Sequence, residues 1–156
     1  AGPRFYKSFA AQERVFGHIL HACAEQGGKI LTLHCVRAVA KVLGHLEQAF
    51  PPDRGRAILH WFTGTPAEAK RAAALGCYFS VNGEMLRSPK HRQMVLGIPL
   101  DRLLTETDGP FVERDGRPLR PRDVTNTVAE MATLRGLSHE NMASTIIQNL
   151  GHLVNS

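Results

Sequence analysis

The sequence has few of the residues that mark disulfide-rich or membrane-embedded proteins. Three cysteines occur in the chain, and this odd number without metal-ligand spacing predicts a reduced, cytoplasmic protein rather than a disulfide scaffold. No apolar run approaches the roughly 20 residues that a membrane span requires, so we expect no membrane partner. Aromatic residues make up only 6% of the chain, which singles out its one tryptophan, Trp61.

Acidic residues are outnumbered by basic ones, 14 to 19, and the formal net charge is +5. A basic balance favours anionic partners, and nucleic acid is the first of these. A chain of 156 residues has the size of one domain, so we expect a single domain over residues 1–156. The sequence does not begin with Met, which leads us to expect that the natural chain starts earlier.

Helix and strand patterns alternate along the chain. Strands are expected at residues 30–34, 57–62, 77–81 and 103–106, and helices at 9–26, 36–50, 66–75, 89–97, 124–136 and 139–153. The expected buried helix faces include Val15, Phe16, Ile19 and Cys23 in the first helix and Met142, Ile146, Leu150 and Leu153 in the last. Short connections favour a parallel α/β sheet. Because a closed (β/α)₈ barrel needs eight strands, the four strands predict a small open sheet or the second half of a barrel.

The chain is organised around residues 103–111, which read as a short buried strand ending in acid. Glu106 and Asp108 are expected to point to the same side of that strand, since the side-chain period of a strand is two. Adjacent carboxylates are costly without a cation or a hydrogen-bond partner. Two earlier strands end in His34 and His60, so three strand ends carry His, His and Asp. This pattern predicts a metal site at the carboxyl-terminal edge of the sheet.

The residue types leave the metal and several roles open. Imidazoles with a carboxylate suit Zn²⁺ or Mn²⁺, whereas more carboxylate and water would suit Mg²⁺. His34 could instead be a buried histidine with a hydrogen-bond partner. Glu106 could be a structural acid rather than a group that supports catalysis.

Basic residues follow two of the predicted strands: Arg87, Lys90 and Arg92 after one, and Arg114, Arg117, Arg120 and Arg122 after another. Loops after parallel strands lie on the same face as the strand ends. We therefore expect Arg87, Arg117 and Arg120 to form a positive rim that holds a DNA backbone, with a solvated loop as the alternative. Trp61 could stack on a terminal base or pack between strand and helix, and Cys35 is expected to be a small buried filler.

Three segments in order along the chain resemble the TatD family of metal-dependent deoxyribonucleases. Residues 33–38 resemble the family's hCR.A segment, residues 60–65 its HCFSG segment, and residues 106–111 its ETDAPF segment. Within the family, residues 60–62, 78–82 and 105–109 look most like the TatD-like nuclease of Qat anti-phage defence systems.

The resemblance implies a (β/α)₈ barrel with two or three divalent metals at its carboxyl-terminal face, and hydrolysis of DNA, usually as a 3′→5′ exonuclease. It implies that His34 and His60 are metal ligands from the fifth and sixth strands. Asp108 matches the eighth-strand ligand that also handles the attacking water. Glu106 matches a supporting acid.

Two features of the family pattern have no counterpart in this sequence, namely the His-x-His pair of the first strand and the Glu of the fourth. We therefore expect the carboxyl-terminal half of a longer enzyme, strands five to eight plus the terminal helices, with a missing amino-terminal segment. One rival is a non-catalytic half-barrel that binds DNA, a partner or other defence-system proteins. Another is a metal-dependent hydrolase of a small molecule.

Overall fold

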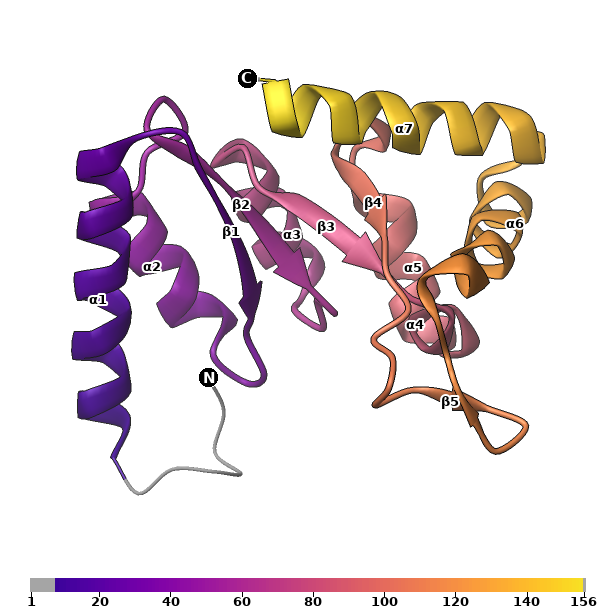
Figure 1. Ribbon diagram of the computed structural model, residues 1–156, viewed down its shortest axis with the longest axis horizontal. Helices are drawn as coiled ribbons and strands as arrows, with labels where there is room; N and C mark the ends of the chain where they lie inside the picture. Colours follow the sequence, from indigo (N-terminus) through magenta and orange to yellow (C-terminus); the bar gives the residue numbers. More distant parts are fainter. Residues whose placement is uncertain (1–7, 156) are drawn as a thin grey trace.

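The sheet of this protein contains four parallel strands that lie in the order of the chain. The computed structural model describes residues 8–155 (Figure 1). Its strands are β1 (Lys29–His34), β2 (Gly55–His60), β3 (Tyr78–Val81) and β4 (Leu103–Thr105), each paired in parallel with the next. The prediction of a four-stranded parallel α/β sheet is confirmed.

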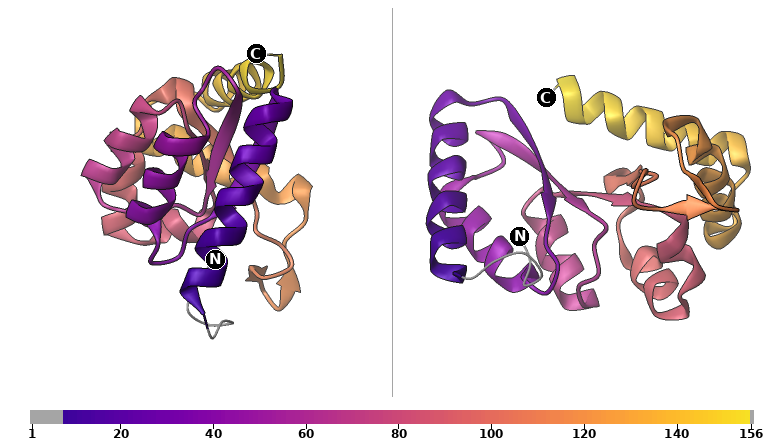
Figure 2. Two further views of the ribbon diagram at one scale, coloured as in Figure 1. Left: turned by 90° about the vertical axis from the view of Figure 1, so that its left-hand side faces the viewer. Right: turned by 60° about the horizontal axis from the view of Figure 1, so that its bottom comes forward.

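The helices that connect consecutive strands cover one face of the sheet, and the last helix lies across the other face (Figures 1 and 2). The helices are α1 (Phe9–Gln26), α2 (Val39–Ala49), α3 (Pro66–Ala74), α4 (Gly83–Arg87), α5 (Pro89–Gly97), α6 (Val124–Arg135) and α7 (His139–Asn155). Short 3₁₀ turns lie at Leu100–Arg102 and Pro121–Asp123, and β5 (Glu113–Arg114) pairs antiparallel with β6 (Arg117–Pro118). None of the helices within residues 8–155 is long and apolar enough to cross a bilayer.

Local sequence signals fix several helix ends. The Ser8 hydroxyl accepts a hydrogen bond from the Ala11 N–H at 3.3 Å, which caps α1. Thr65 and Glu68 form a capping box at the start of α3, with Pro66 at the first helical position. Gly136 ends α6 in the left-handed conformation, at φ 66°. These predicted helix ends are confirmed.

The hydrophobic core lies between the sheet and its helices. The side chains of Leu59, Phe79, Val81 and Leu103 are fully buried there, and each contributes about 1.5–3 kcal/mol of burial free energy. Burial raises the pKa of the Cys35 thiol to about 11, so the prediction that this residue is a buried filler is confirmed.

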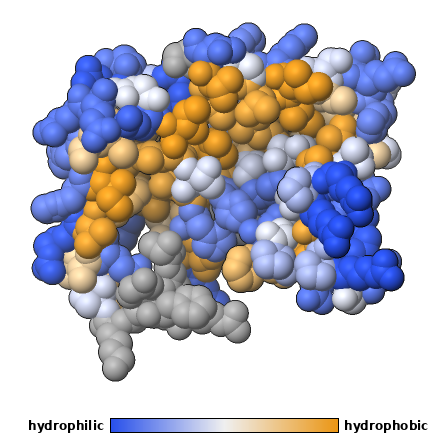
Figure 3. Space-filling view, viewed as in Figure 1, coloured by the Kyte–Doolittle hydropathy of each residue, from blue (hydrophilic) through white to orange (hydrophobic). Residues whose placement is uncertain are grey.

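The opposite face of the sheet is only partly covered. Helix α7 packs across its amino-terminal end, where Leu153 contacts Tyr78 and Leu104. Elsewhere the residues that the structure describes leave this face uncovered, and Ile30 is 41% exposed. Figure 3 shows a continuous apolar band on this side of the molecule. Helices α1 and α7 also carry exposed apolar side chains: Val15, Ile19, Ile147, Leu150 and Val154. Parallel sheets normally have both faces covered, so this face has the character of an interface.

Two strands end earlier than predicted. Strand β2 ends at His60 because Trp61 takes a left-handed backbone conformation, at φ 44°. Strand β4 ends at Thr105, so Glu106 and Asp108 follow the strand rather than belonging to it. The prediction that a period of two aligns these carboxylates is therefore wrong.

Some predicted helix faces are also wrong. Val15 and Ile19 are 59% and 47% exposed, while Leu20 is fully buried, because α1 packs at the edge of the sheet against β1 and α2. Val36 precedes α2 and is exposed. In α7, Leu150 is 49% exposed, whereas Met142 is buried as predicted. The sequence did not indicate α4 or the β5–β6 hairpin.

Candidate metal centre

Two histidines lie side by side at the carboxyl-terminal edge of the sheet. His34 and His60 end β1 and β2 and are direct register partners. Their ring centroids are 5.2 Å apart, with the planes tilted by 46°. The parallel register alone brings them together, as the strand-end pattern predicted.

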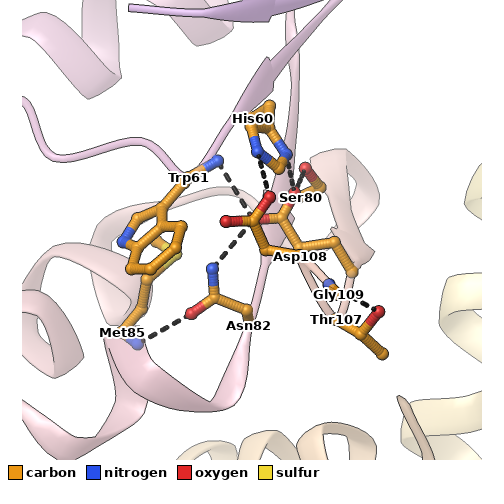
Figure 4. Close-up of polar contacts among 9 residues, drawn as sticks. His60, Trp61, Ser80, Asn82, Met85, Thr107, Asp108 and Gly109 are labelled. Carbon is orange, nitrogen blue, oxygen red and sulfur yellow. Dashed lines mark hydrogen bonds and ion pairs between the residues drawn. The ribbon is translucent and has the colours of Figure 1, made fainter. Parts of the chain in front are cut away.

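The Glu106 carboxylate receives hydrogen bonds from four other residues (Figure 4). Its Oε1 accepts from the Trp61 backbone N–H at 3.2 Å and from the Asn82 amide at 2.9 Å. Its Oε2 accepts from the Ser80 hydroxyl and lies 2.5 Å from Nδ1 of His60. These donors come from the ends of β2 and β3, so the carboxylate is fixed from two strands. A structural acid would be paired with an arginine or with a backbone amide, and of these two kinds of partner Glu106 has the backbone amide of Trp61.

Asp108 completes the surroundings of His60. Its Oδ1 lies 2.9 Å from Nε2 of His60, so a carboxylate faces each nitrogen of the ring. Asp108 has a left-handed backbone conformation, with φ 53°, as does Trp61 after β2. Such conformations are unfavourable for residues other than glycine and are concentrated at functional sites. The two carboxylates converge because the chain turns sharply beyond the strand ends.

The two histidines have opposite electrostatic surroundings. The hydrogen bond with Glu106 raises the pKa of His60, aided by the negative charges of Glu106 and Asp108 and opposed by burial. Burial lowers the pKa of His34, and the neighbouring His60 lowers it further. The neutral form of His34, which has a free electron pair for a metal ion, is thereby favoured.

The donor atoms fit part of a metal-binding site. Nε2 of His60 and Oδ1 of Asp108 are 2.9 Å apart, close to the spacing of neighbouring ligands that each lie about 2.1 Å from one ion. Glu106 binds the other nitrogen of His60, which is how outer carboxylates orient ligating imidazoles. Within residues 8–155, no group of three or more His, Cys, Asp or Glu side chains is placed so that it could hold a metal ion by itself. A metal ion bound at this edge would need ligands beyond these side chains.

The residues of the predicted basic rim follow two different strands, as expected, but two of them lie on a short helix and a hairpin strand rather than in loops. Arg87 lies on α4, in an ion pair with Glu84 at 3.0 Å. Arg117 lies on β6, and both Arg117 and Arg120 are exposed. The segment after Asp108 thus presents its arginines from a hairpin, and the segment after β3 presents Arg87 from a short helix.

Of the two alternatives for Trp61, the structure agrees with packing between strand and helix, and another aromatic residue is more exposed. Trp61 is partly buried and packs against the hydrophobic core. Phe111, three residues beyond Asp108, is 88% exposed. Sequence reasoning also missed Ser80 and Asn82 as contributors to the site. A usable signal was present, since both are polar and end the third strand at the same edge of the sheet.

Gly109 explains one departure from the family-like segment, which has alanine at this position. A Cβ at Gly109 would lie 1.9 Å from the carbonyl oxygen of Leu119. The hairpin segment therefore closes directly onto the residue after Asp108, and only glycine fits there.

Comparisons with known proteins relate this chain to one family. The family model described as "TatD related DNase" matches residues 3–155. The chain is 37% identical over 149 residues to the 3′-5′ ssDNA/RNA exonuclease TatD of Pantoea vagans, covering 88% of this chain and 56% of that protein. It is 30% identical over 128 residues to the uncharacterized metal-dependent hydrolase YjjV of Escherichia coli, covering 79% of this chain and 49% of that protein.

Solved structures show the same fold. The crystal structure of the E. coli TatD homologue YjjV superposes with a TM-score of 0.82 at 27% identity, covering 97% of this chain and 61% of that one. An uncharacterized amidohydrolase from Saccharomyces cerevisiae gives a TM-score of 0.84 at 18% identity, covering 96% and 61%. This chain thus spans between 49% and 61% of the length of these relatives. From the matched residues and the shared fold, the chain belongs to the TatD-related DNase family.

Proposed function

We propose that this protein hydrolyses DNA phosphodiesters with divalent metal ions, as a 3′→5′ exonuclease on single-stranded DNA. The observation that carries the proposal is the placement of His60 between Glu106 and Asp108, with His34 beside it. The family membership and the exonuclease name of the Pantoea relative support the reaction type.

Each residue has a proposed role. His34, His60 and Asp108 bind metal, and the choice among Mg²⁺, Mn²⁺ and Zn²⁺ follows from how many oxygen ligands complete the site. Bound divalent ions would lower the pKa of a water molecule and neutralise charge on the phosphate. Asp108 directs the attacking water, and Glu106 holds the His60 ring.

The surrounding surface is proposed to hold the nucleic acid. Arg117 and Arg120 contact phosphates, as does Arg87 after exchange of its Glu84 partner. Phe111 is more exposed than Trp61 and is the better stacking platform for a base, because stacking needs a free aromatic face.

We also propose that residues 1–156 form one domain with an amino-terminal segment, as the second half of a (β/α)₈ barrel. The open apolar face of the sheet supports this, and so does the chain's coverage of only 56% of the Pantoea relative. The segment would supply the ligands that the site still needs. Denaturing mass spectrometry of the natural protein tests this: we expect a mass about 8–12 kDa above the 17.2 kDa of this chain, and a match to 17.2 kDa would contradict it.

The proposed setting is an anti-phage defence system in the cytoplasm. The resemblance of residues 60–62, 78–82 and 105–109 to the Qat nuclease supports the first point. Three free cysteines, two of them buried, support the second. Plaque counts with the intact defence operon, with and without Asp108→Asn, test the defence role, and equal protection would contradict it.

The central experiment measures digestion of 5′-labelled single-stranded DNA by the full-length protein with Mn²⁺ or Mg²⁺. We expect Asp108→Asn to reduce the rate by at least about 100-fold, the range for removing one group that stabilises transition-state charge, while the fold is retained. Asp101→Asn is the matched control, since Asp101 is exposed and precedes β4 at the opposite end of the sheet. Unchanged digestion by Asp108→Asn would contradict the proposal.

Two other outcomes would favour the rival functions. A protein that digests nothing but retains a partner or DNA in the presence of chelator would be a scaffold. Turnover of a small ester or amide that is unchanged by Arg117→Ala and Arg120→Ala would indicate a small-molecule hydrolase.

A further inference from the structure

The side chain of Asn82 links a helix terminus to the candidate metal centre. Asn82 is fully buried and lies directly after β3. Its Oδ1 accepts a hydrogen bond from the Met85 N–H at 3.0 Å, which caps α4. Its Nδ2 donates to Oε1 of Glu106 at 2.9 Å. One amide group therefore serves both structures, as Figure 4 shows.

The two ends of this amide are not interchangeable. A rotation by half a turn would place the amide NH₂ against the Met85 N–H and the amide oxygen against the Glu106 carboxylate. Both arrangements are repulsive, because donor would face donor and acceptor would face acceptor. The cap on α4 thus determines that a donor is directed at Oε1 of Glu106.

The hydrogen bonds to Oε1 of Glu106 determine which partners remain for Oε2. The Asn82 amide and the Trp61 N–H occupy Oε1, which leaves Oε2 for Nδ1 of His60 and for the Ser80 hydroxyl. With Nδ1 bound in this way, the opposite nitrogen of His60 is directed at Asp108.

A purely structural role for Asn82 would need only its oxygen. Serine and aspartate cap helices about as well as asparagine does. An ionised aspartate has no donor, and serine has a single short hydroxyl, whereas asparagine has a separate NH₂ group beyond its capping oxygen. The NH₂ group of Asn82 is used only by Glu106 among the hydrogen bonds of the described residues. The choice of asparagine at this buried position is thus explained by the carboxylate, not by the helix.

We propose that Asn82 is a positioning residue, which holds Glu106 so that the His60 ring presents Nε2 to the metal ion. The inference depends on the proposed function for the metal itself. The hydrogen-bond chain from Asn82 through Glu106 to His60 does not, and it can be measured without metal.

Two variants separate the helix cap from the carboxylate contact. Asn82→Asp keeps an oxygen for the Met85 N–H but sets a second carboxylate against Glu106. Asn82→Ser keeps a capping hydroxyl, adds no charge and is too short to support Glu106. Asn141→Asp is the matched control, because Asn141 is exposed in the first turn of α7 and receives the same change of charge.

The first readout, in the full-length protein, is the His60 Nδ1 proton in ¹H–¹⁵N spectra recorded without metal. A proton held by a carboxylate is shifted downfield and exchanges slowly with water. We expect both Asn82 variants to lose this resonance or shift it upfield, and Asn141→Asp to retain it. The second readout is the Zn²⁺ affinity by calorimetry, which we expect to fall by about 10- to 100-fold, as when the outer partner of a ligating histidine is removed.

The outcomes are distinct. A folded Asn82→Ser protein with the wild-type resonance would overturn the inference, whether or not Asn82→Asp folds. Loss of the resonance with unchanged Zn²⁺ affinity would also overturn it, because His60 would then bind metal without this support. If the wild-type protein binds no Zn²⁺ and digests no DNA, the proposed function fails, and the resonance alone then decides whether Asn82 positions His60.

Discussion

The ends of β1 and β2 carry the same residue type in direct register, yet His34 and His60 differ in almost every physical respect. His60 lies between two carboxylates, and its hydrogen bond with Glu106 raises its pKa. His34 is exposed at the edge strand of the sheet, and desolvation lowers its pKa. The difference follows from the neighbours: β2 is flanked on both sides, whereas β1 has a described partner strand on one side only.

The side chains of His60 and His34 are therefore held in place to different degrees by the described residues. His60 is already oriented by residues of this chain, so its half of the site is preorganised. His34 ends the edge strand β1, which has one neighbouring strand among the described residues. The following predictions test this difference, from the largest expected effect to the smallest.

The largest difference between the two histidines is expected when each is replaced by alanine and the free energy of unfolding is measured. In the metal-free protein, His60→Ala leaves Glu106 and Asp108 without the imidazole between them, and we expect a loss of about 1–3 kcal/mol in the free energy of unfolding. His34→Ala should change it by no more than about 0.5 kcal/mol. Urea titrations measure both values, and equal losses would refute the comparison.

Glu106→Gln tests whether orientation of His60 matters for metal binding. The glutamine keeps the size of the side chain but places an NH₂ group where one oxygen accepted hydrogen bonds. We expect Zn²⁺ affinity to fall by about 10- to 100-fold, as measured by calorimetry. Glu130→Gln, on the exposed surface of α6, is the control and should bind as the wild type does.

The free energy of unfolding should fall on both sides of about pH 6.5, because of His60 at higher pH and because of His34 at lower pH. The folded pKa of His60 is raised above 6.5, so its stabilisation is complete below about pH 6.5 and is lost as the pH rises through the higher folded value. The folded pKa of His34 is lowered, so the unfolded chain binds more protons below pH 6.5 and stability falls as the pH drops there. His60→Gln should flatten the fall at higher pH and His34→Gln the fall at lower pH, as measured by urea midpoints. A single slope that neither variant changes would contradict the assignment.

The arginines of the hairpin should give the smallest effect. Arg117 and Arg120 are exposed, so Arg117→Ala and Arg120→Ala should weaken single-stranded DNA binding only a few-fold, with the slope of log affinity against log salt falling by about one each. Arg14→Ala, on the exposed surface of α1, should leave the slope unchanged. Fluorescence anisotropy at several salt concentrations measures this slope. Equal slopes for the Arg117, Arg120 and Arg14 variants would show that Arg117 and Arg120 are not part of the proposed DNA interface.

The parallel sheet could be predicted because local signals were strong. The capping box at Thr65, the apolar strands and the short connections each depend on neighbouring residues in the chain. The alignment of His34 with His60 followed from parallel pairing alone. For the same reason, the edge of the sheet that holds the candidate site was predictable.

The details of the site were not predictable, because they depend on distant contacts. The left-handed conformations of Trp61 and Asp108 end β2 early and turn Asp108 back towards His60. The hydrogen bonds of Ser80 and Asn82 with Glu106 join residues that lie 26 and 24 positions apart. No local pattern encodes either feature. The exposed Val15 and Ile19 had a helical pattern that predicted burial, but the edge position of α1 decided otherwise.

The contact between Gly109 and Leu119 has a consequence for how this region can vary in length. The hairpin closes at this contact with no space for a Cβ, so residues inserted near either end would displace the chain beside Asp108. The turn at Asp115 and Gly116 is different, since both residues are exposed and already have left-handed backbones, at φ 53° and 71°. Extra residues or a fluorescent label introduced at that turn should be tolerated, and a label there would report the arrival of DNA while the metal centre stays as it is.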